Sequence, residues 1–393
     1  MYETSPGPLG ADGRAPNRHR LEFTASGSEY FRIWIVNLLL MVVTLGLYLP
    51  WAKVRKLKYF YSNTWVDGDA LDFHGEPGKM LRGTLIAGAM LIVFSLASNI
   101  SPAAAAVAGV AFVALWPLLF RASMRFRLAN TSWRGLRFHF AGSTAGAYGA
   151  VMPPMILALV VLLLPLMLVD TDAAAGALRT PPAMSPTAAG LMGLSITLFV
   201  LAVPYFLWRV KRYQHGNYVW GSLQTELRTG PGSFYWIVLK LVGMLVTAGV
   251  VFVLFSVLIG AGTGLGRRQG LGVAAVLLVV AVVLVFNVLP KTYLQVRLQN
   301  LLWTRTGNGT VRFRSDLSLP GYFGLQLKNY LLIFLTLGLY WPFAVVHSRR
   351  AQLEAVELHT RVPLDRITQT ATRENPGATG DMAADLFGVD IGL

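Results

Sequence analysis

Eight long apolar stretches, separated by polar loops, constrain this chain more than any other feature of its sequence. They lie at 31–49, 80–98, 103–120, 147–169, 188–208, 233–257, 271–289 and 321–346. A helix rises about 1.5 Å per residue, so segments of this length match a hydrocarbon core of about 30 Å. Lipid cannot hydrogen-bond to the backbone, and a helix satisfies its own polar groups. The sequence therefore predicts an all-α, multi-pass membrane protein, and its 54% hydrophobic and 13% charged residues agree.

Basic residues are concentrated in alternate loops, and this asymmetry predicts the orientation of the chain. Nineteen Lys and Arg fall in the four loops at 51–79, 121–146, 209–232 and 290–319. The intervening connections at 99–102, 170–187 and 258–270 hold three. Short loops rich in Lys and Arg stay in the cytoplasm. We therefore expect the four basic loops there, where the net charge of +15 indicates attraction to anionic lipids of that leaflet and not to nucleic acid.

Three of the four basic loops share a motif in which an aromatic residue precedes an Asn by four positions, on one face of a helix that leaves the membrane, and the fourth has Val296 in the aromatic position. One interpretation is a collar of basic and aromatic groups that binds lipid headgroups or a partner protein. The other is positive-inside charge with an interfacial aromatic belt, in which the Asn caps the helix. The candidate binding residues, which we call the collar residues, are Arg55, Lys58, Tyr59, Asn63, Arg125, Phe126, Asn130, Arg212, Tyr213 and Asn217.

Short alternating runs follow this motif and predict β elements in the cytoplasmic loops. Runs at 71–75, 136–140 and 311–314 alternate apolar and polar residues beside a Gly. Strands from several loops could pair into one small sheet, because a single strand or hairpin is barely stable alone.

The first and last apolar stretches repeat each other. At a constant offset of 292 residues, 12 of 23 positions are identical, including a Thr-Leu-Gly-Leu-Tyr block at 44–48 and 336–340. Gly46, Pro50, Gly338 and Pro342 are candidate breaks in these segments.

Two topologies follow from these breaks. The first, which we favour, has six full transmembrane helices as three hairpins, with the two broken segments entering and leaving on one face. The alternative has eight transmembrane helices. In both, a membrane domain at 19–360 lies between flexible tails at 1–18 and 361–393.

Several of these segments resemble a known family. The block Thr-Leu-Gly-Leu-Tyr-x-Pro-Trp-Ala at 44–52, a following basic-aromatic segment, Asn-Thr at 63–64 and Phe-x-Gly at 73–75 are similar to the YjgN-like family. The resemblance extends over roughly 20–360. It implies a multi-pass protein of the bacterial inner membrane, grouped as a domain of unknown function, and implies no activity or catalytic residue.

Three of the apolar stretches carry a polar residue at a matching position. Lys240 lies within 233–257, and Asn37 and Asn329 align with it in the two related segments. The three could line one polar cavity. The alternative is that Lys240 extends its amine toward the cytoplasmic surface, because a charge in the hydrocarbon core is costly.

Signatures of catalysis and metal binding are missing from the sequence. The six His lack metal-ligand spacing, there is no Cys, and no phosphate-binding or nucleophile motif occurs. We therefore expect no enzyme, no cofactor and no metal site. The first hypothesis is a transport or lipid-handling protein, and the alternative is a structural or assembly protein whose collar binds anionic lipid or a partner protein that the sequence does not name.

Overall fold

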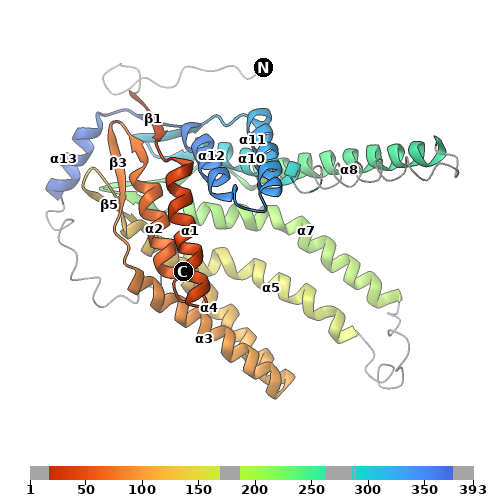
Figure 1. Ribbon diagram of the computed structural model, residues 1–393. Coiled ribbons are helices and arrows are strands. Elements are labelled where there is room, and N and C mark those ends of the chain that lie inside the picture. The colour runs from red at the N-terminus through yellow and green to blue at the C-terminus, as the bar shows by residue number, and fades with distance from the viewer. Residues whose placement is uncertain (1–16, 169–185, 263–285, 287, 375–393) are drawn as a thin grey trace.

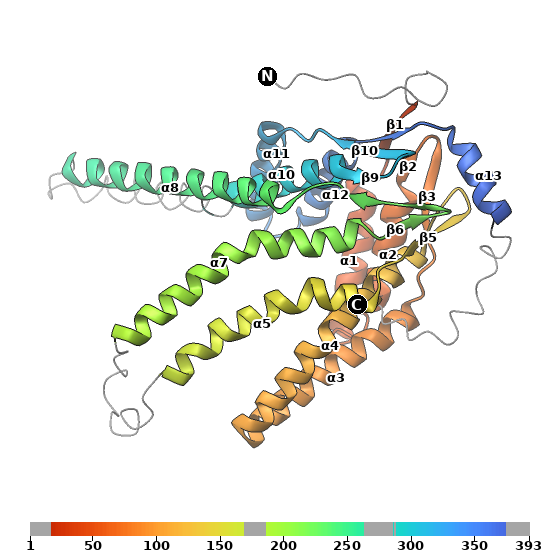
Figure 2. The same cartoon turned by 180° about the vertical axis from the view of Figure 1, so that it is seen from behind.

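The structure, a computed structural model, describes residues 17–168, 186–262, 286 and 288–374. Long helices spread outward from a compact β-sheet that lies at one end of the molecule (Figure 1). The view from behind shows the same arrangement, with α5, α7 and α8 diverging as they leave the sheet (Figure 2).

The sheet is antiparallel and built from short strands of two to seven residues. Its order is β7-β6-β5-β4-β3-β2-β1-β11-β10-β9-β8. The strands are β1 (Asn17–Phe23), β2 (Thr64–Val66), β3 (Asp69–Phe73), β4 (Thr131–Trp133), β5 (Leu136–Phe140), β6 (Tyr218–Trp220), β7 (Leu223–Gln224), β8 (Glu226–Leu227), β9 (Thr306–Gly307), β10 (Val311–Ser315) and β11 (Val356–Thr360).

The two end strands of this order are neighbours in the sequence, so the sheet closes on itself. Only Thr225 separates β7, which pairs with β6, from β8, which pairs with β9. β3 and β5 divide their pairing in the same way, the first half with the preceding strand and the second half with the following one. We call this closed sheet the strand ring.

Tight turns make half of the connections in the strand ring. Asp67-Gly68 and Arg134-Gly135 join β2 to β3 and β4 to β5. All four residues have positive φ, between 51° and 80°. Two-residue turns of this kind match the twist of the flanking strands, and Gly adopts the second position without a steric penalty.

Pairs of helices make the other connections, five times along the described chain. The strands on either side of each pair hydrogen-bond to each other, so each pair leaves from the strand ring and returns to it. The helices are α1 (Gly27–Val43) and α2 (Leu49–Ser62), α3 (Pro77–Ile100) and α4 (Pro102–Ala129), α5 (Thr144–Leu168) and α7 (Pro186–His215), α8 (Pro231–Gly262) and α10 (Leu289–Arg305), and α11 (Leu319–Leu335) and α12 (Trp341–Glu354).

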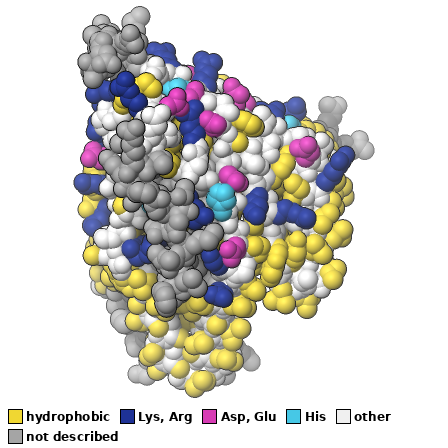
Figure 3. Space-filling view, turned by 90° about the vertical axis from the view of Figure 1, so that its left-hand side faces the viewer, with side chains coloured by type: hydrophobic (Ala, Val, Ile, Leu, Met, Phe, Trp, Pro, Cys, Tyr) yellow, Lys and Arg dark blue, Asp and Glu magenta, His cyan; other side chains and the backbone are white. Residues whose placement is uncertain are grey.

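Within the described residues, five helices are long and apolar enough to cross a membrane, namely α3, α4, α5, α7 and α8. Their surfaces carry many exposed Leu, Val and Ile side chains. The space-filling view separates charged side chains, which gather over the upper part of the molecule, from hydrophobic side chains on the lower part (Figure 3). This separation is the one expected of a protein that is partly immersed in lipid.

The prediction of an all-α protein with six full transmembrane helices is wrong. The described residues contain an eleven-stranded sheet and five candidate membrane helices, and the predicted stretch 271–289 falls largely outside them. The alternating runs at 71–75, 136–140 and 311–314 do lie in or beside β3, β5 and β10, but the strands of two or three residues are too short to show a period. The partner of a strand across a helix pair lies tens of residues away, so local sequence could not reveal the pairing.

The alternative with eight spanning helices does not hold either, because the first and last apolar segments each fold as two helices joined by a turn. In the turns, Leu45-Gly46 and Leu337-Gly338 have positive φ, and Pro50 and Pro342 lie in the first turns of α2 and α12. Leu45 and Leu337 at the tips are each 94% exposed. Apolar tips without protein contacts fit a hairpin that dips into lipid.

The last described helix packs against one end of the strand ring (Figure 1). α13 (Leu364–Glu374) buries Leu364 and Ile367 against Trp133, Trp220 and other ring side chains. These residues belong to the segment 361–393 that the sequence assigns to a flexible tail. The apolar spacing of Leu364 and Ile367 explains the difference, because it gives a short helix one face to bury. Of the predicted tails at 1–18 and 361–393, residues 1–16 and 375–393 lie outside the described residues.

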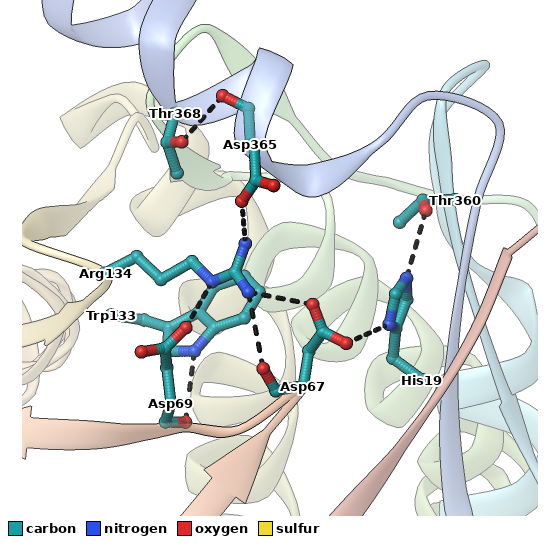
Figure 4. A network of polar contacts seen from close by, with 8 residues as sticks. All are labelled: His19, Asp67, Asp69, Trp133, Arg134, Thr360, Asp365 and Thr368. Carbon is teal, nitrogen blue, oxygen red and sulfur yellow. Dashed lines mark hydrogen bonds and ion pairs between the residues drawn. The ribbon is translucent and has the colours of Figure 1, made fainter.

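The Arg134 guanidinium holds α13 on the strand ring (Figure 4). It donates to Asp69 Oδ2 at 2.6 Å, to Asp67 Oδ2 at 2.8 Å and to Asp365 Oδ1 of α13 at 2.8 Å. His19 of β1 extends the network through an Nδ1 contact with Asp67 Oδ1 at 2.8 Å. Three strands and α13 are thus joined by one arginine and its carboxylates.

Replacing Ile367 with Asp should detach α13 from the strand ring. A carboxylate cannot remain unpaired in this apolar interior, and loss of the side chain removes about 2–5 kcal/mol of packing free energy. Trypsin should then cut faster at Arg361, measured by mass spectrometry of the full chain. Gln369→Asp, which adds the same charge on the exposed face of α13, is the control. Equal cleavage rates in both variants would contradict this packing.

Candidate functional site

A cavity of about 830 Å³ lies where the helix pairs meet the strand ring. Its walls come from α2, α10, α11 and α12, with one residue of α4, and its roof comes from β1, β2, β3, β10 and β11. It extends from ring residues such as Leu71 and Phe313 to Ile333 and Trp341 near the tip of the last helix pair. Small-molecule sites usually measure about 300–1,000 Å³. The cavity therefore has the size of a ligand site.

Four basic side chains from four different helices line this cavity: Lys56, Arg127, Lys291 and Arg349. We call them the cavity cations. The lining contains no Asp or Glu. Among the described residues, none of the four cations forms an ion pair. A concave surface lined by one sign of charge concentrates ions of the opposite sign.

Aromatic rings position two of the cavity cations. Lys56 Nζ lies 5.6 Å from the centre of the Trp341 ring and 5.9 Å from that of Phe60. Lys291 Nζ donates to the Tyr330 hydroxyl at 3.2 Å. Burial, followed by the nearby charge of Arg349, lowers the pKa of Lys56 below the usual lysine value. The fold therefore holds like charges near one another, which an anion between them would relieve.

Amide and hydroxyl groups form the rest of the polar lining. The Asn329 amide donates to Ser348 Oγ at 3.2 Å, and the Gln326 amide donates to the same oxygen at 3.1 Å. Gln352 donates to the Tyr322 hydroxyl at 2.8 Å. Asn329 is only 2% exposed, and its Oδ1 lacks a hydrogen-bond partner among the described residues. A buried oxygen of this kind is costly unless a donor reaches it.

The three predicted cavity residues do not come together. Asn329 lines the cavity. Asn37 is buried at the equivalent place in α1, with its Oδ1 likewise unpartnered among the described residues, but it does not line the cavity. Lys240 is exposed on α8, where its Nζ lies 4.8 Å from the centre of the Trp236 ring. The sequence offset matched the depth of these residues along their helices and could not determine which way each side chain faces.

The Asn collar residues have structural contacts at the ends of their helices. The side-chain amides of Asn63, Asn130 and Asn217 donate to the carbonyls of Tyr59, Phe126 and Tyr213, at 2.7, 2.8 and 2.7 Å. Their own backbone carbonyls accept from residues at the ends of β1, β3 and β5, at 2.7–3.0 Å. Each Asn therefore ends a helix and fixes the start of a strand.

The aromatic collar residues anchor neighbouring helices. The Tyr59 hydroxyl donates to the Ser26 carbonyl at 3.0 Å, and the Tyr213 hydroxyl donates to the Ser143 carbonyl at 3.0 Å. Phe126 is buried beside Phe73 and Met80. These contacts fit the capping interpretation. The basic collar residues Arg55, Lys58, Arg125 and Arg212 are exposed and lie outside the cavity lining.

The cavity cations were missed by the sequence analysis although they lie close to collar residues. Lys56 is adjacent to Arg55, and Arg127 follows Phe126. Only the rotation of each helix distinguishes a basic residue that faces the cavity from one that faces outward. One usable signal was the polar face of α10, where Thr292, Gln295 and Gln299 recur at helical spacing.

Comparison with known proteins identifies the family. The model of the family described as "Bacterial protein of unknown function (DUF898)" matches residues 18–386. The chain belongs to this family. It is 24% identical to the inner membrane protein YjgN of Salmonella typhimurium over 344 residues, which cover 83% of this chain and 85% of the relative. The resemblance to YjgN-like proteins is confirmed.

Two further relatives match a shorter part of the chain. It is 29% identical to YjgN of Escherichia coli O157:H7 over 133 residues, 33% of each protein, and 30% identical to YjgN of E. coli K12 over 131 residues, 33% of this chain and 32% of the relative. No solved structure matches the chain. The inner-membrane names of these relatives and the five long apolar helices together support an inner-membrane location.

Replacing Asn130 with Ala should destabilise the protein. The variant loses the half-buried bond to the Phe126 carbonyl, and such a bond contributes about 1 kcal/mol. We expect the midpoint of thermal unfolding in detergent to fall by about 2 °C. Asn99→Ala is the matched control, because the Asn99 amide makes the same type of bond to Ser95 from an exposed position. An equal effect of the two substitutions would argue against a special role of the Asn130 cap.

Proposed function

We propose that this protein is a non-enzymatic lipid-handling or transport protein of the inner membrane that holds an amphiphile in the cavity beneath the strand ring. The observation that carries the proposal is the position of this cavity, whose mainly apolar lining holds four basic side chains and several amide and hydroxyl groups, between hairpins whose outer surfaces and tips are apolar. An amphiphile has a polar headgroup for the lining and apolar chains for the surrounding helices.

The closed interior of the strand ring supports entry from the membrane side. Trp133, Trp220 and Leu358 fill the ring together with Leu364 and Ile367 of α13. The ring interior therefore offers no open passage to a water-soluble solute, and we propose that an amphiphile approaches between the helices that line the cavity. The proposal therefore favours lipid handling over the passage of a soluble solute.

Hairpins on both sides of the cavity support contact with lipid. Phe334 and Leu335 of α11 are exposed on the outside of the helix whose other face carries Asn329 and Gln326. One helix thus offers an apolar face to the bilayer and a polar face to the cavity. We further propose that the strand ring lies on the cytoplasmic face, because the basic loops are parts of it.

The repetition of elements around the ring supports a second inference, that the five strand–helix–helix–strand units derive from one repeated unit. Three of them end in the same Asn cap. In the first and last units, Thr44 and Thr336 also make equivalent turn contacts, each accepting from the amide four residues later at 2.9–3.0 Å.

A second candidate function is a structural or assembly role in which the collar binds anionic lipid or a partner protein. It is favoured by the exposed Arg55, Lys58, Arg125 and Arg212, none of which forms an ion pair among the described residues. Such exposed cations at the ends of membrane helices are suited to lipid phosphates.

Filling the cavity should abolish lipid binding. We would titrate the full chain in a neutral detergent with phosphatidylethanolamine and phosphatidylglycerol and count bound lipids by native mass spectrometry. Gln295→Trp places a large ring in the cavity and should remove the tightly bound lipid. Leu331→Trp, which adds the same ring on the exposed face of α11, should bind lipid as the parent does.

Two results would contradict the proposal. Either the parent protein retains neither lipid, or Gln295→Trp binds both as tightly as Leu331→Trp does. Loss of binding after removal of the four exposed collar cations, with Gln295→Trp unaffected, would favour the second candidate function.

A further inference from the structure

The charge of the cavity is not compensated by the protein, although the chain compensates cations elsewhere. Arg134 contacts three carboxylates, those of Asp67, Asp69 and Asp365. The cavity cations have no such partners in the described part of the chain, and no carboxylate lines their cavity. Four positive charges therefore line one cavity, with Lys56 half-buried and the other three exposed, and no carboxylate of the described lining neutralises them.

Two of the cavity cations, Lys56 and Lys291, are positioned by protein contacts before any ligand binds. Lys56 lies against the rings of Trp341 and Phe60, and Lys291 is hydrogen-bonded to Tyr330. The four cavity cations come from α2, α4, α10 and α12, so they surround the cavity and do not form a stripe along one helix. Cations held on several sides can contact more than one anionic group of the same headgroup at a small entropic cost.

A single negative charge would leave most of the cavity charge unbalanced. A phosphodiester carries one negative charge, whereas a headgroup with two phosphates carries at least two. Charge complementarity therefore favours the second type. Phosphate oxygens also suit Arg and Lys donors, which bind them through charge-assisted hydrogen bonds.

The unpartnered Asn329 oxygen adds a second requirement. Asn329 lines the cavity, and its buried Oδ1, which has no partner among the described residues, can only accept a hydrogen bond. A phosphate oxygen offers no proton there, but a hydroxyl group on the same headgroup does. A headgroup with both phosphate and hydroxyl groups would satisfy the cavity cations and Asn329 together.

We infer that the amphiphile in this cavity is an acidic lipid whose headgroup carries at least two phosphate charges and a hydroxyl group, held by Lys56, Arg127, Lys291 and Arg349. This inference rests on the proposed lipid-handling function and adds the chemical class of the ligand. The cavity, rather than the collar that lies outside it, is the selective site.

A headgroup series tests the inference. The full chain in neutral detergent is titrated with phosphatidylethanolamine, phosphatidylglycerol and cardiolipin of matched acyl chains, and separately with inorganic pyrophosphate, with native mass spectrometry as the readout. Cardiolipin has two phosphates and a central hydroxyl, so it should bind at least tenfold more tightly than phosphatidylglycerol. Phosphatidylethanolamine should bind more weakly than both.

Paired charge removals localise the site. Lys56→Gln with Arg349→Gln should weaken cardiolipin binding at least tenfold. Arg55→Gln with Lys58→Gln removes the same charge from exposed positions, partly on the same helix, and should change binding less than threefold. Lys56→Arg with Arg349→Lys keeps both charges and should retain binding, which shows that the first pair did not fail through misfolding.

The outcomes separate this inference from the function on which it rests. If the three lipids bind equally and Gln295→Trp abolishes all of them, the headgroup assignment is overturned and the lipid-handling proposal stands. If pyrophosphate binds as tightly as cardiolipin, the phosphate chemistry stands and the lipid source is overturned. If none of the probes binds, both proposals fall. An equal loss in the two charge-removal pairs overturns the assignment to the cavity.

Discussion

Backbone hydrogen bonding between the two ends of the described chain is the interaction on which the rest of this structure depends. β1 and β11 pair in register from Asn17↔Thr360 to Arg20↔Glu357. Strands of two to seven residues would not persist alone, and an open sheet of this size would expose two unpaired edges. Closure removes both edges at once, which makes ten short pairings cooperative.

Side chains next to this junction reinforce it. Arg350 of α12 donates to the carbonyls of Phe23 and Ala25, at 3.2 and 2.8 Å. Phe343 and Trp341 of the last helix pair contact Phe31 and Trp34 of the first. The helix pairs consequently surround a common space, and the cavity exists only because the first and last units meet. Its charge follows from the same geometry, because α2, α4, α10 and α12 each contribute one cation from a different part of the chain.

Much of the local structure could be predicted from the sequence. One interpretation of the sequence has Asn63, Asn130 and Asn217 end their helices. Each side-chain amide donates a hydrogen bond to the carbonyl four residues earlier. The Gly at 46 and 338 lies in a turn with positive φ, as a break in the apolar segment requires. The helix between Leu364 and Glu374 was not expected, because its two buried side chains are apolar residues in an otherwise polar segment. No nearby part of the sequence indicated the surface of the strand ring against which these two side chains pack.

The sequence by itself determined that the chain belongs in a membrane and that its basic segments stay together on one side of the apolar ones, because burial of apolar helices and exclusion of charge depend on composition and length alone. Only the tertiary structure decided that short strands join into a ring, that Lys240 faces outward and that Lys56, Arg127, Lys291 and Arg349 face one cavity. Strand pairing across helix pairs and the rotation of each helix about its axis depend on contacts between residues far apart in the chain, and no local pattern of residues encodes them.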